Sequence, residues 1–255
     1  YSKTDKDATF MRMKEDHMRN GQLKPAYNVQ ISTNNQFIAS YSLHQQSTDT
    51  NTLISHLQDH IKAYKKKPSN LTADAGYGSE QNYQWLEDKR ITAYVKHNQF
   101  DRNQHEKTRN KNPYAADKLV YNEAKDQFIC PSGKPMKYIG QHIKKTKAGY
   151  EQFIDNYQAK KCTGCPLRNQ CHDQKGNRII QVNHNLNRLK AKADKRLKSK
   201  RGIQKRKQRC FDTEPVFANI KNNHHFKRFY LRGLNKVNVE LGLIAIAHNL
   251  RKKVA

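Results

Sequence analysis

Apolar and polar residues alternate near the start of the chain in a way that predicts two strands. Apolar side chains occupy alternate positions of residues 26–33 and again of residues 37–43. Asn34 and Asn35 separate the two runs, and asparagine is favoured where a tight turn needs unusual backbone angles. The pattern predicts an antiparallel hairpin. Residues 1–24 are polar and basic without a clear period.

The next residues predict helices and strands in alternation. Apolar residues recur at helical spacing over residues 53–64, with Asp49 as the candidate N-cap. A short strand over residues 71–74, a helix capped by Ser79 and a strand over residues 91–95 follow. The order hairpin, helix, strand, helix, strand predicts a mixed α/β layer with a central sheet.

Beyond this point the pattern divides the rest of the chain into two parts. Residues 97–185 are polar and loop-rich, show no sustained period, and indicate an insertion with its own small fold. Residues 186–209 predict a very basic helix, and the nearly apolar residues 234–250 predict a helix buried against the sheet. We therefore expect residues 1–96 to form part of a core that residues 186–255 complete.

The charge balance indicates what kind of partner the chain binds. There are 49 Lys and Arg against 22 Asp and Glu, a net charge of +27, and only 35% of residues are hydrophobic. Such an excess attracts a polyanion and releases its counterions. No run approaches the roughly 18 apolar residues that span a membrane, and no helix carries the aromatic face of a membrane-surface binder. Nucleic acid is the favoured partner, and no membrane is expected.

The start of the sequence and its cysteine content indicate the cellular compartment. The chain opens on Tyr1 and contains no signal-like apolar segment. We expect a fragment or truncated reading frame of an intracellular, cytoplasmic protein. Clustered cysteines favour metal binding over a secreted disulfide framework.

Two carboxylates stand where a divalent cation could be held. Asp74 ends the short apolar strand, and Gly76 and Gly78 let the backbone turn sharply after it. Glu214 precedes Pro215, which is tolerated in the first turn of a helix. Each acid also has a simpler interpretation, because Asp often closes a turn and Glu favours the positive end of a helix.

A lysine strengthens the catalytic interpretation of Glu214. Lys221 follows seven positions later, on the same face of a helix, where it could hold a phosphate. Mg²⁺ or Mn²⁺ takes oxygen ligands and is usually held by a few carboxylates plus substrate phosphate. Two such ions support an in-line displacement at phosphorus. If Asp74 and Glu214 converge, the residues predict metal-dependent phosphoryl transfer.

Four of the five cysteines lie in the insertion: Cys130, Cys162, Cys165 and Cys171. Their spacing resembles a structural zinc site of four thiolates, which would hold together a segment that has little core. The alternative is four unrelated thiols, and His142 or His172 could each replace one cysteine. The remaining Cys210 is expected to be a small apolar filler near the catalytic helix.

Two basic segments are candidate DNA tracks, residues 188–209 and residues 221–232, the second with interleaved aromatic residues. Phosphate contacts of this kind give affinity and salt dependence but little sequence readout. His44 and Asp49 favour cap and turn roles over metal binding. The residues expected to contact DNA are Arg209, Lys221, Lys227, Arg228 and Arg232.

Several short motifs follow one another along nearly the whole chain: residues 4–11 (TDKDATFM), 27–30 (YNVQ), 73–77 (ADAGY), 214–217 (EPVF) with Lys221, and 229–233 (FYLRG) leading to 248–251 (HNLR). The series resembles the transposases of bacterial insertion sequences, most closely the group numbered eleven-eighty-two, with a DDE catalytic domain. The ordered series is more specific than any one motif.

The resemblance implies an RNase H-like fold in which two Asp and one Glu bind two divalent metals. Asp74 matches the second Asp, Glu214 the Glu, and Lys221 the basic residue that follows it. The implied activity is hydrolytic nicking at the ends of the element, then attack of the freed 3′-hydroxyl on target DNA. The implied partners are double-stranded DNA and, in the full-length protein, a second copy.

The chain departs from the family pattern in two places. The family's first Asp lies on a strand before the hairpin, which this sequence does not include, and Asp5 and Asp7 are expected to be loop residues. Where the family has an Arg four positions before the Glu, this chain has Cys210, with Arg209 one place earlier. We therefore expect an inactive C-terminal fragment. The alternatives are a non-catalytic zinc-containing nucleic-acid-binding protein and an RNase H-like nuclease.

Overall fold

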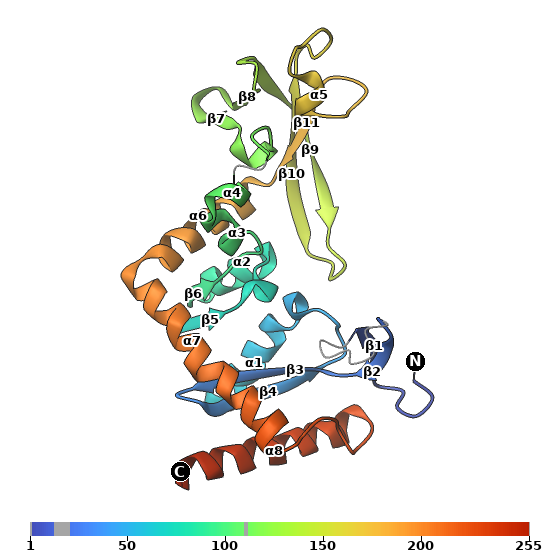
Figure 1. The fold of residues 1–255 in the computed structure, drawn as a ribbon, viewed down its shortest axis with the longest axis vertical. Helices are drawn as coiled ribbons and strands as arrows, with labels where there is room; N and C mark the ends of the chain where they lie inside the picture. Colours follow the sequence, from blue (N-terminus) through green and yellow to red (C-terminus); the bar gives the residue numbers. More distant parts are fainter. Residues whose placement is uncertain (1, 13–20, 110–111, 255) are drawn as a thin grey trace. The chain divides into compact units, whose positions relative to one another are not determined.

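The computed structural model describes residues 2–12, 21–109 and 112–254 (Figure 1). The chain forms two compact units. Unit 1 comprises Tyr1–Asn98 with Lys192–Ala255, and unit 2 comprises Gln99–Ala191. Among the helices of these described ranges, none is both long and apolar enough to cross a membrane.

Unit 1 begins with two antiparallel hairpins. Strand β1 (Thr9–Arg12) pairs with β2 (Leu23–Ala26), although the sequence of residues 1–24 predicted no strand. Strand β3 (Asn28–Asn34) pairs with β4 (Phe37–His44), which confirms the predicted hairpin. The turn falls one residue later than predicted, on Asn35 and Gln36, with φ of 50° and 65°.

The helix–strand–helix–strand series is confirmed. Helix α1 (Leu53–Tyr64), strand β5 (Asn70–Ala73), helix α2 (Glu80–Asp88) and strand β6 (Thr92–Val95) follow in order, and β5 and β6 are parallel. Ser79 caps α2 by accepting a hydrogen bond from the Asn82 amide at 3.2 Å. The N-cap of α1 is Thr52, so the prediction of Asp49 was wrong.

Asp49 instead opens a short 3-10 turn, η1 (Asp49–Asn51). A second such turn, η2 (Ala75–Tyr77), follows β5, and Gly78 ends it. A Cβ at Gly78 would lie 2.3 Å from the Lys96 carbonyl oxygen, so only glycine lets this turn approach the end of β6.

The basic segment predicted as one helix, residues 186–209, is divided between two helices. Helix α6 (His184–Lys198) ends before Ser199, whose Oγ accepts a hydrogen bond from the Gly202 amide at 3.1 Å and so caps α7 (Lys200–Ala218). A π-helical turn, η5 (Asn219–Asn223), and helix α8 (Leu234–Val254) complete the chain.

Glu214 does not open a helix, and this prediction was also wrong. It lies far along α7, and Pro215 is inside the helix. Proline has no amide hydrogen, so the carbonyl four residues earlier, that of Phe211, loses its helical partner. Gln36 replaces it: its Nε2 donates to the Phe211 oxygen at 2.9 Å. A partner from the β3–β4 turn therefore satisfies the backbone group that proline leaves open.

Helix α8 packs one face against the hairpin. Its buried residues include Val237, Leu241 and Ala245. Asn249 pairs with the backbone of Ile38 in β4, donating to its oxygen at 2.9 Å and accepting from its nitrogen at 2.8 Å. The opposite face of α8 is exposed, so the prediction of a buried helix holds for one face only.

Unit 2 contains an antiparallel sheet that the sequence did not predict. Its order is β11-β10-β9-β8-β7, formed by Ile179–Val182, Glu151–Ala159, Pro135–Lys145, Gln127–Ile129 and Val120–Asn122. Most of β9 is exposed, and a register shift at Asn156 and Tyr157 breaks the alternation of β10. Because of these two features, the sequence does not show the alternation of apolar and polar residues that is typical of strands.

Short helical turns precede or connect these strands: α3 (Phe100–Gln104), α4 (Glu106–Arg109) and η3 (Ala116–Lys118) come before β7, η4 (Glu123–Lys125) lies between β7 and β8, and α5 (Arg168–Cys171) lies between β10 and β11. The unit has a real apolar core, made of Phe128, Met136, Tyr157, Ala159, Cys162, Ile180 and Val182. The expectation of a loop-rich insertion with little core was therefore wrong.

Unit 1 is a mixed α/β arrangement that fits an RNase H-like fold. The predicted continuous central sheet is not formed, however. Within the described part of the chain, β3 pairs only with β4 and β5 only with β6, so the core contains two separate strand pairs.

Candidate metal and DNA site

One cleft of about 2190 Å³ lies within unit 1. Residues of β3 form one side of it, residues of β5 a second, and residues of α7 and η5 a third. Asp74 and Glu214 both line this cleft. The two acids singled out from the sequence therefore face the same space, although the cleft is large.

Asp74 follows the last residue of β5 and is half-buried. Its Oδ1 accepts a hydrogen bond from the Gly76 amide at 2.9 Å, which fixes the carboxylate at the start of η2. This is the turn-closing role that the simpler interpretation gave to Asp74. It uses one oxygen, and Oδ2 accepts no hydrogen bond from the described residues, so the turn role leaves an oxygen available to a ligand.

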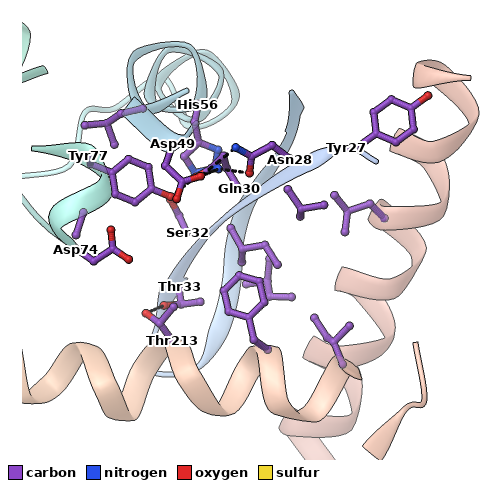
Figure 2. A pocket seen from close by; sticks show the side chains of 18 of the residues that line it. Tyr27, Asn28, Gln30, Ser32, Thr33, Asp49, His56, Asp74, Tyr77 and Thr213 are labelled. Carbon is purple, nitrogen blue, oxygen red and sulfur yellow. Dashed lines mark hydrogen bonds between the residues drawn. The ribbon is translucent and has the colours of Figure 1, made fainter. Parts of the chain in front are cut away.

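Asp49 is the functional candidate that sequence reasoning missed. Its Oδ1 accepts hydrogen bonds from Asn28 Nδ2 at 2.9 Å and from Gln30 Nε2 at 3.2 Å (Figure 2). A Cβ built on Gly76 would lie 3.1 Å from Asp74 Oδ1 and 3.3 Å from Asp49 Oδ2, so both carboxylates lie against this glycine. The only signal in the sequence is that Asp49, like Asp74, follows shortly after a strand.

A hydrogen-bond network holds the Asp49 carboxylate in place. Tyr77 donates its hydroxyl hydrogen to Gln30 Oε1, which orients the Gln30 amide so that its nitrogen faces Asp49. Burial and then the charges of Asp49 and Asp74 raise the pKa of Tyr77, while the charge of Arg209 acts in the opposite direction. Tyr77 therefore remains a neutral hydrogen-bond donor at physiological pH.

The two turns that carry the carboxylates are also joined through their backbones. Thr50 Oγ1 donates to the Gly76 oxygen at 2.9 Å. The buried Asn82 side chain donates to the oxygens of both Thr50 and Tyr77, at 2.8 and 2.9 Å. Because α2 fixes both turns, the Asp49–Asp74 pair is set by the fold and does not depend on exposed side-chain rotamers.

Glu214 reaches the cleft from α7. Its neighbour Thr213 meets Thr33 of β3, with 3.3 Å between their hydroxyl oxygens, which places this part of α7 over the hairpin (Figure 2). Glu214 is exposed and makes no hydrogen bond or ion pair with the described residues. Lys221 lies in the π-helical turn η5, so the seven-residue spacing does not correspond to two turns of a regular α-helix.

The carboxylates of these acids suit a hard divalent cation, but the set of metal ligands is incomplete. Carboxylate oxygens are the ligands that Mg²⁺ and Mn²⁺ prefer. Asp49 and Asp74 supply such oxygens side by side. Over residues 2–12, 21–109 and 112–254, however, no three His, Cys, Asp or Glu side chains form a group that could hold a metal ion. Asp49 and Asp74 thus bring two carboxylates together, and in the described residues no third ligand joins them.

Basic side chains surround the acids. All the residues expected to contact DNA line the same cleft: Arg209, Lys221, Lys227, Arg228 and Arg232. Lys205 and the acid Asp212 lie there as well. A cleft lined by both acids and many cations is favourable for a phosphate backbone.

The predicted four-cysteine zinc site in unit 2 is not formed in the structure. Cys162 belongs to the apolar core, and Cys130 packs against it. The buried Arg178 donates from its backbone nitrogen to Cys162 Sγ at 3.4 Å and from Nη1 to Cys171 Sγ at 3.0 Å. A hydrogen bond with Ser132 Oγ, at 3.0 Å, is the main reason that the pKa of Cys165 is lowered. The sulfurs are engaged by protein groups, and they do not converge as a ligand set.

The remaining cysteine and the proposed substitute ligands have other roles. Cys210 is exposed on α7, so the prediction of an apolar filler was wrong. His172 accepts from the Gln174 amide through Nδ1 at 3.2 Å, and the Asn156 amide contacts His142 Nδ1 at 3.0 Å. His44 makes a hydrogen bond with Ser42 Oγ at 2.7 Å, on the hairpin.

The two N-terminal acids lie in a turn, as predicted. Asp5 accepts hydrogen bonds from the Tyr27 hydroxyl and the Gly233 amide, and Asp7 Oδ2 accepts from the Leu234 amide at 2.8 Å. Burial raises the pKa of Asp5, but hydrogen bonds led by that of Gly233 lower it overall. Both acids fasten the N-terminal segment to the start of α8, where a helix favours negative charge.

Comparison with known proteins supports the family named by the sequence motifs. Residues 129–254 match the family described as a transposase DDE domain. The match covers just under half of the chain and includes Glu214 and Lys221, but not Asp49 or Asp74. No curated protein and no solved structure matches the chain. The match supports a DDE transposase, with DNA binding and nuclease or transposase chemistry as the implied activity.

Proposed function

We propose that this chain is part of a DDE transposase of the insertion-sequence group numbered eleven-eighty-two, and that the unit 1 cleft holds its active site. The observation that carries the proposal is that Asp49, Asp74 and Glu214 line one cleft whose walls are basic. Asp74 and Glu214 are the proposed metal ligands, and Asp49 is a further carboxylate beside Asp74. The substrate is double-stranded DNA, at the ends of the element and at the target.

We infer that an additional strand, from residues outside this sequence, lies in the cleft. The described part of β3 pairs on one edge only, as does that of β5, and both strands line the cleft. Unpaired strand edges are ready to accept another strand. A strand between them would join the two pairs into one sheet. It could also bring the first Asp of the family pattern beside Asp74, completing the metal site.

In this mechanism each group has a distinct task. Mg²⁺ or Mn²⁺, if bound there, would supply the Lewis-acid chemistry of an in-line phosphoryl transfer. Asp74 and Glu214 would hold the ions, and the hydrogen bonds from Asn28 and Gln30 orient Asp49. Lys221 and Arg209 bind phosphates of the DNA strand. Without the additional strand, the 255-residue chain is expected to bind DNA but not to cut it.

Iron-mediated cleavage of the polypeptide tests the metal site without requiring activity. Fe²⁺ replaces Mg²⁺ at carboxylate sites, and with ascorbate and peroxide it produces radicals that cut the backbone next to its ligands. We expect cuts near residues 49 and 74, which excess Mg²⁺ and the Asp74→Asn variant both suppress. Asp88→Asn, an exposed acid of α2, is the matched control and should leave the cuts unchanged. Cuts distributed without preference would refute the site.

A longer chain tests the additional strand and the reaction. Including the in-frame residues that precede Tyr1 should protect the amides of β3 and β5 from hydrogen exchange and should produce Mg²⁺-dependent nicking of DNA. Asp74→Asn and Glu214→Gln should each abolish nicking while DNA binding and its salt dependence persist. Nicking that survives in either variant would overturn the assignment.

A structural zinc ion in unit 2 stays a prediction from the sequence. Four thiols on neighbouring turns support it, and the hydrogen bonds of Arg178 to Cys162 and Cys171 oppose it. Metal analysis of the purified chain decides: one zinc per chain that is lost in Cys165→Ser would establish the site, and a zinc-free folded chain would exclude it.

The second candidate function is a non-catalytic nucleic-acid-binding protein. The absence of a three-ligand group from the described residues favours it. Two measurements separate the candidates. A non-catalytic protein would bind DNA equally well with and without Mg²⁺, and it would show no nicking even with the additional strand. An RNase H-like nuclease would nick DNA but would not join the freed 3′-end to a target.

A further inference from the structure

The segment between η5 and α8, residues 224–233, has neither helix nor strand, yet hydrogen bonds fix its backbone. The Phe226 amide donates to a backbone oxygen of η5 at 3.0 Å. Farther along, the two oxygens of the Glu240 carboxylate accept hydrogen bonds from the Tyr230 and Leu231 amides, each at 3.0 Å. A loop whose backbone is already held loses little conformational freedom when it binds a ligand.

The aromatic side chains of this loop differ in exposure. Phe226 and Phe229 are half-buried and meet edge to face, with 5.2 Å between their ring centroids, and Phe229 also meets Tyr27 at 6.2 Å. Tyr230 is 76% exposed, and its side chain makes no hydrogen bond or ring contact with the described residues. The loop therefore presents the Tyr230 ring to a ligand on a fixed backbone.

Cations flank Tyr230 along the loop. Lys227, Arg228 and Arg232 are exposed and line the cleft of unit 1, as do the residues on either side of Tyr230. Tyr230 therefore lies beside the cleft, between groups that bind phosphate. Proteins bind unpaired nucleotides with this combination, because cations follow the sugar–phosphate backbone while the bases stack on aromatic rings.

We propose that Tyr230 is a stacking platform for an unpaired base of the DNA that the cleft binds. The inference rests on the proposed function, from which it takes DNA as the ligand, and it adds a structural feature of that DNA. A ring that enters a duplex must first unstack two base pairs. An unpaired base at a strand end or in an overhang stacks on the ring without that cost. Because every base has a π-face, the platform selects unpaired DNA and not a particular sequence.

Fluorescence anisotropy with labelled DNA tests this preference. The two ligands are a duplex with a short overhang and the same duplex whose overhang is abasic, so that both carry the same phosphates. EDTA prevents cleavage, and 3′ and 5′ overhangs are compared separately. We expect the parent chain to bind one of the overhangs about fivefold tighter when its bases are present, the ratio that corresponds to stacking of ~1 kcal/mol. Equal affinity with and without bases, in both overhangs, would overturn the proposal.

Substitutions of Tyr230 separate stacking from other contacts. Tyr230→Ala should abolish the preference for an overhang with bases, whereas Tyr230→Phe should keep it, because the hydroxyl has no partner among the described residues. The matched control is Phe211→Ala, which removes a ring that is 71% exposed on α7 and is not among the residues lining the cleft. It should keep the preference. Trp85 fluorescence confirms that each variant folds. A preference that survives in Tyr230→Ala, or that is lost equally in Phe211→Ala, would refute the platform.

A 2-aminopurine base in the overhang reports stacking directly, because its fluorescence falls when it stacks on an aromatic ring. The parent chain and Tyr230→Phe should quench this fluorescence, and Tyr230→Ala should not. Glu240→Gln replaces one acceptor oxygen with an NH₂ donor, so one of the two loop amides loses its partner. Quenching should then weaken while the affinity for a blunt duplex stays unchanged. Equal quenching by the parent chain and Tyr230→Ala would show that Tyr230 does not stack on the base.

These measurements distinguish failure of the platform from failure of the proposed function. A parent chain that binds no DNA would contradict both. A parent chain that binds DNA equally well with and without bases in the overhang would contradict the platform alone. The predicted Mg²⁺-dependent nicking does not depend on that result.

Discussion

The buried histidine of α1 gives a quantitative prediction for the stability of unit 1. His56 is 4% exposed and joins α1 to the hairpin, with Nε2 at 2.6 Å from Ser32 Oγ and Nδ1 at 2.7 Å from Ser42 Oγ. Burial, and then the charges of His44 and His60, lower the pKa of His56 to about 4. The folded protein therefore keeps His56 neutral over a range in which the unfolded chain is protonated.

The sign and size of the pH effect on the free energy of unfolding follow from proton linkage. The unfolded histidine has a pKa of about 6.5, so between that pH and about 4 the unfolded state binds more protons and the free energy of unfolding decreases as pH falls. The contribution of neutral His56 to the free energy of unfolding is fully present above pH ~6.5. By pH ~4 about 3 kcal/mol of it is lost, at roughly 1.4 kcal/mol per pKa unit.

Urea unfolding followed by the fluorescence of Trp85, the one tryptophan of the chain, measures this effect in unit 1. The His56→Gln variant should be less stable than the parent at pH 7.5, and the difference should shrink by about 3 kcal/mol towards pH 4. His225→Gln removes an exposed histidine of the same unit and should keep the pH slope of the parent. Equal slopes for the parent and His56→Gln would refute a buried neutral histidine.

Further predictions concern α7, the second carboxylate, the turn after β5 and the basic cleft. Gln36→Ala removes the partner of the Phe211 carbonyl and should lower the free energy of unfolding by about 1 kcal/mol in urea titrations, with no loss if water replaces the amide. Asp49→Asn should weaken Mn²⁺ binding about tenfold by calorimetry, and unchanged affinity would exclude Asp49 from the metal site. Gly78→Ala should cost more than 2 kcal/mol by thermal unfolding, because backbone lies where its Cβ would be; a change below 0.5 kcal/mol would contradict the close approach. Arg232→Gln should reduce the salt slope of DNA binding by about one unit, measured by anisotropy, and an unchanged slope would remove it from the track.

Sequence reasoning was reliable where the structure depends on neighbours along the chain. The β3–β4 hairpin, α1, the β5–α2–β6 unit and the Ser79 cap all follow from period and cap chemistry over a few residues. The sheet of unit 2 was not predicted because most of β9 is exposed and a register shift interrupts β10. Helix α7 was predicted in two pieces because Pro215 is tolerated in the first turn of a helix, so Glu214 was expected to open a new one. In the structure Pro215 lies inside α7, and Gln36, far away in sequence, supplies the replacement hydrogen bond.

The sequence by itself determined the charge, the motif series and the positions of Asp74 and Glu214 after a strand and near a proline. It could not show that Asp49 joins Asp74, since that pairing depends on Gln30, Asn28 and the turn around Gly76, which meet only in the folded chain. Nor could it show that α8 buries one face and exposes the other, because an apolar run has the same composition on both sides. Local periodicity depends only on the order of residues along the chain. The convergence of charged groups and the exposure of a helix face depend instead on how the chain packs.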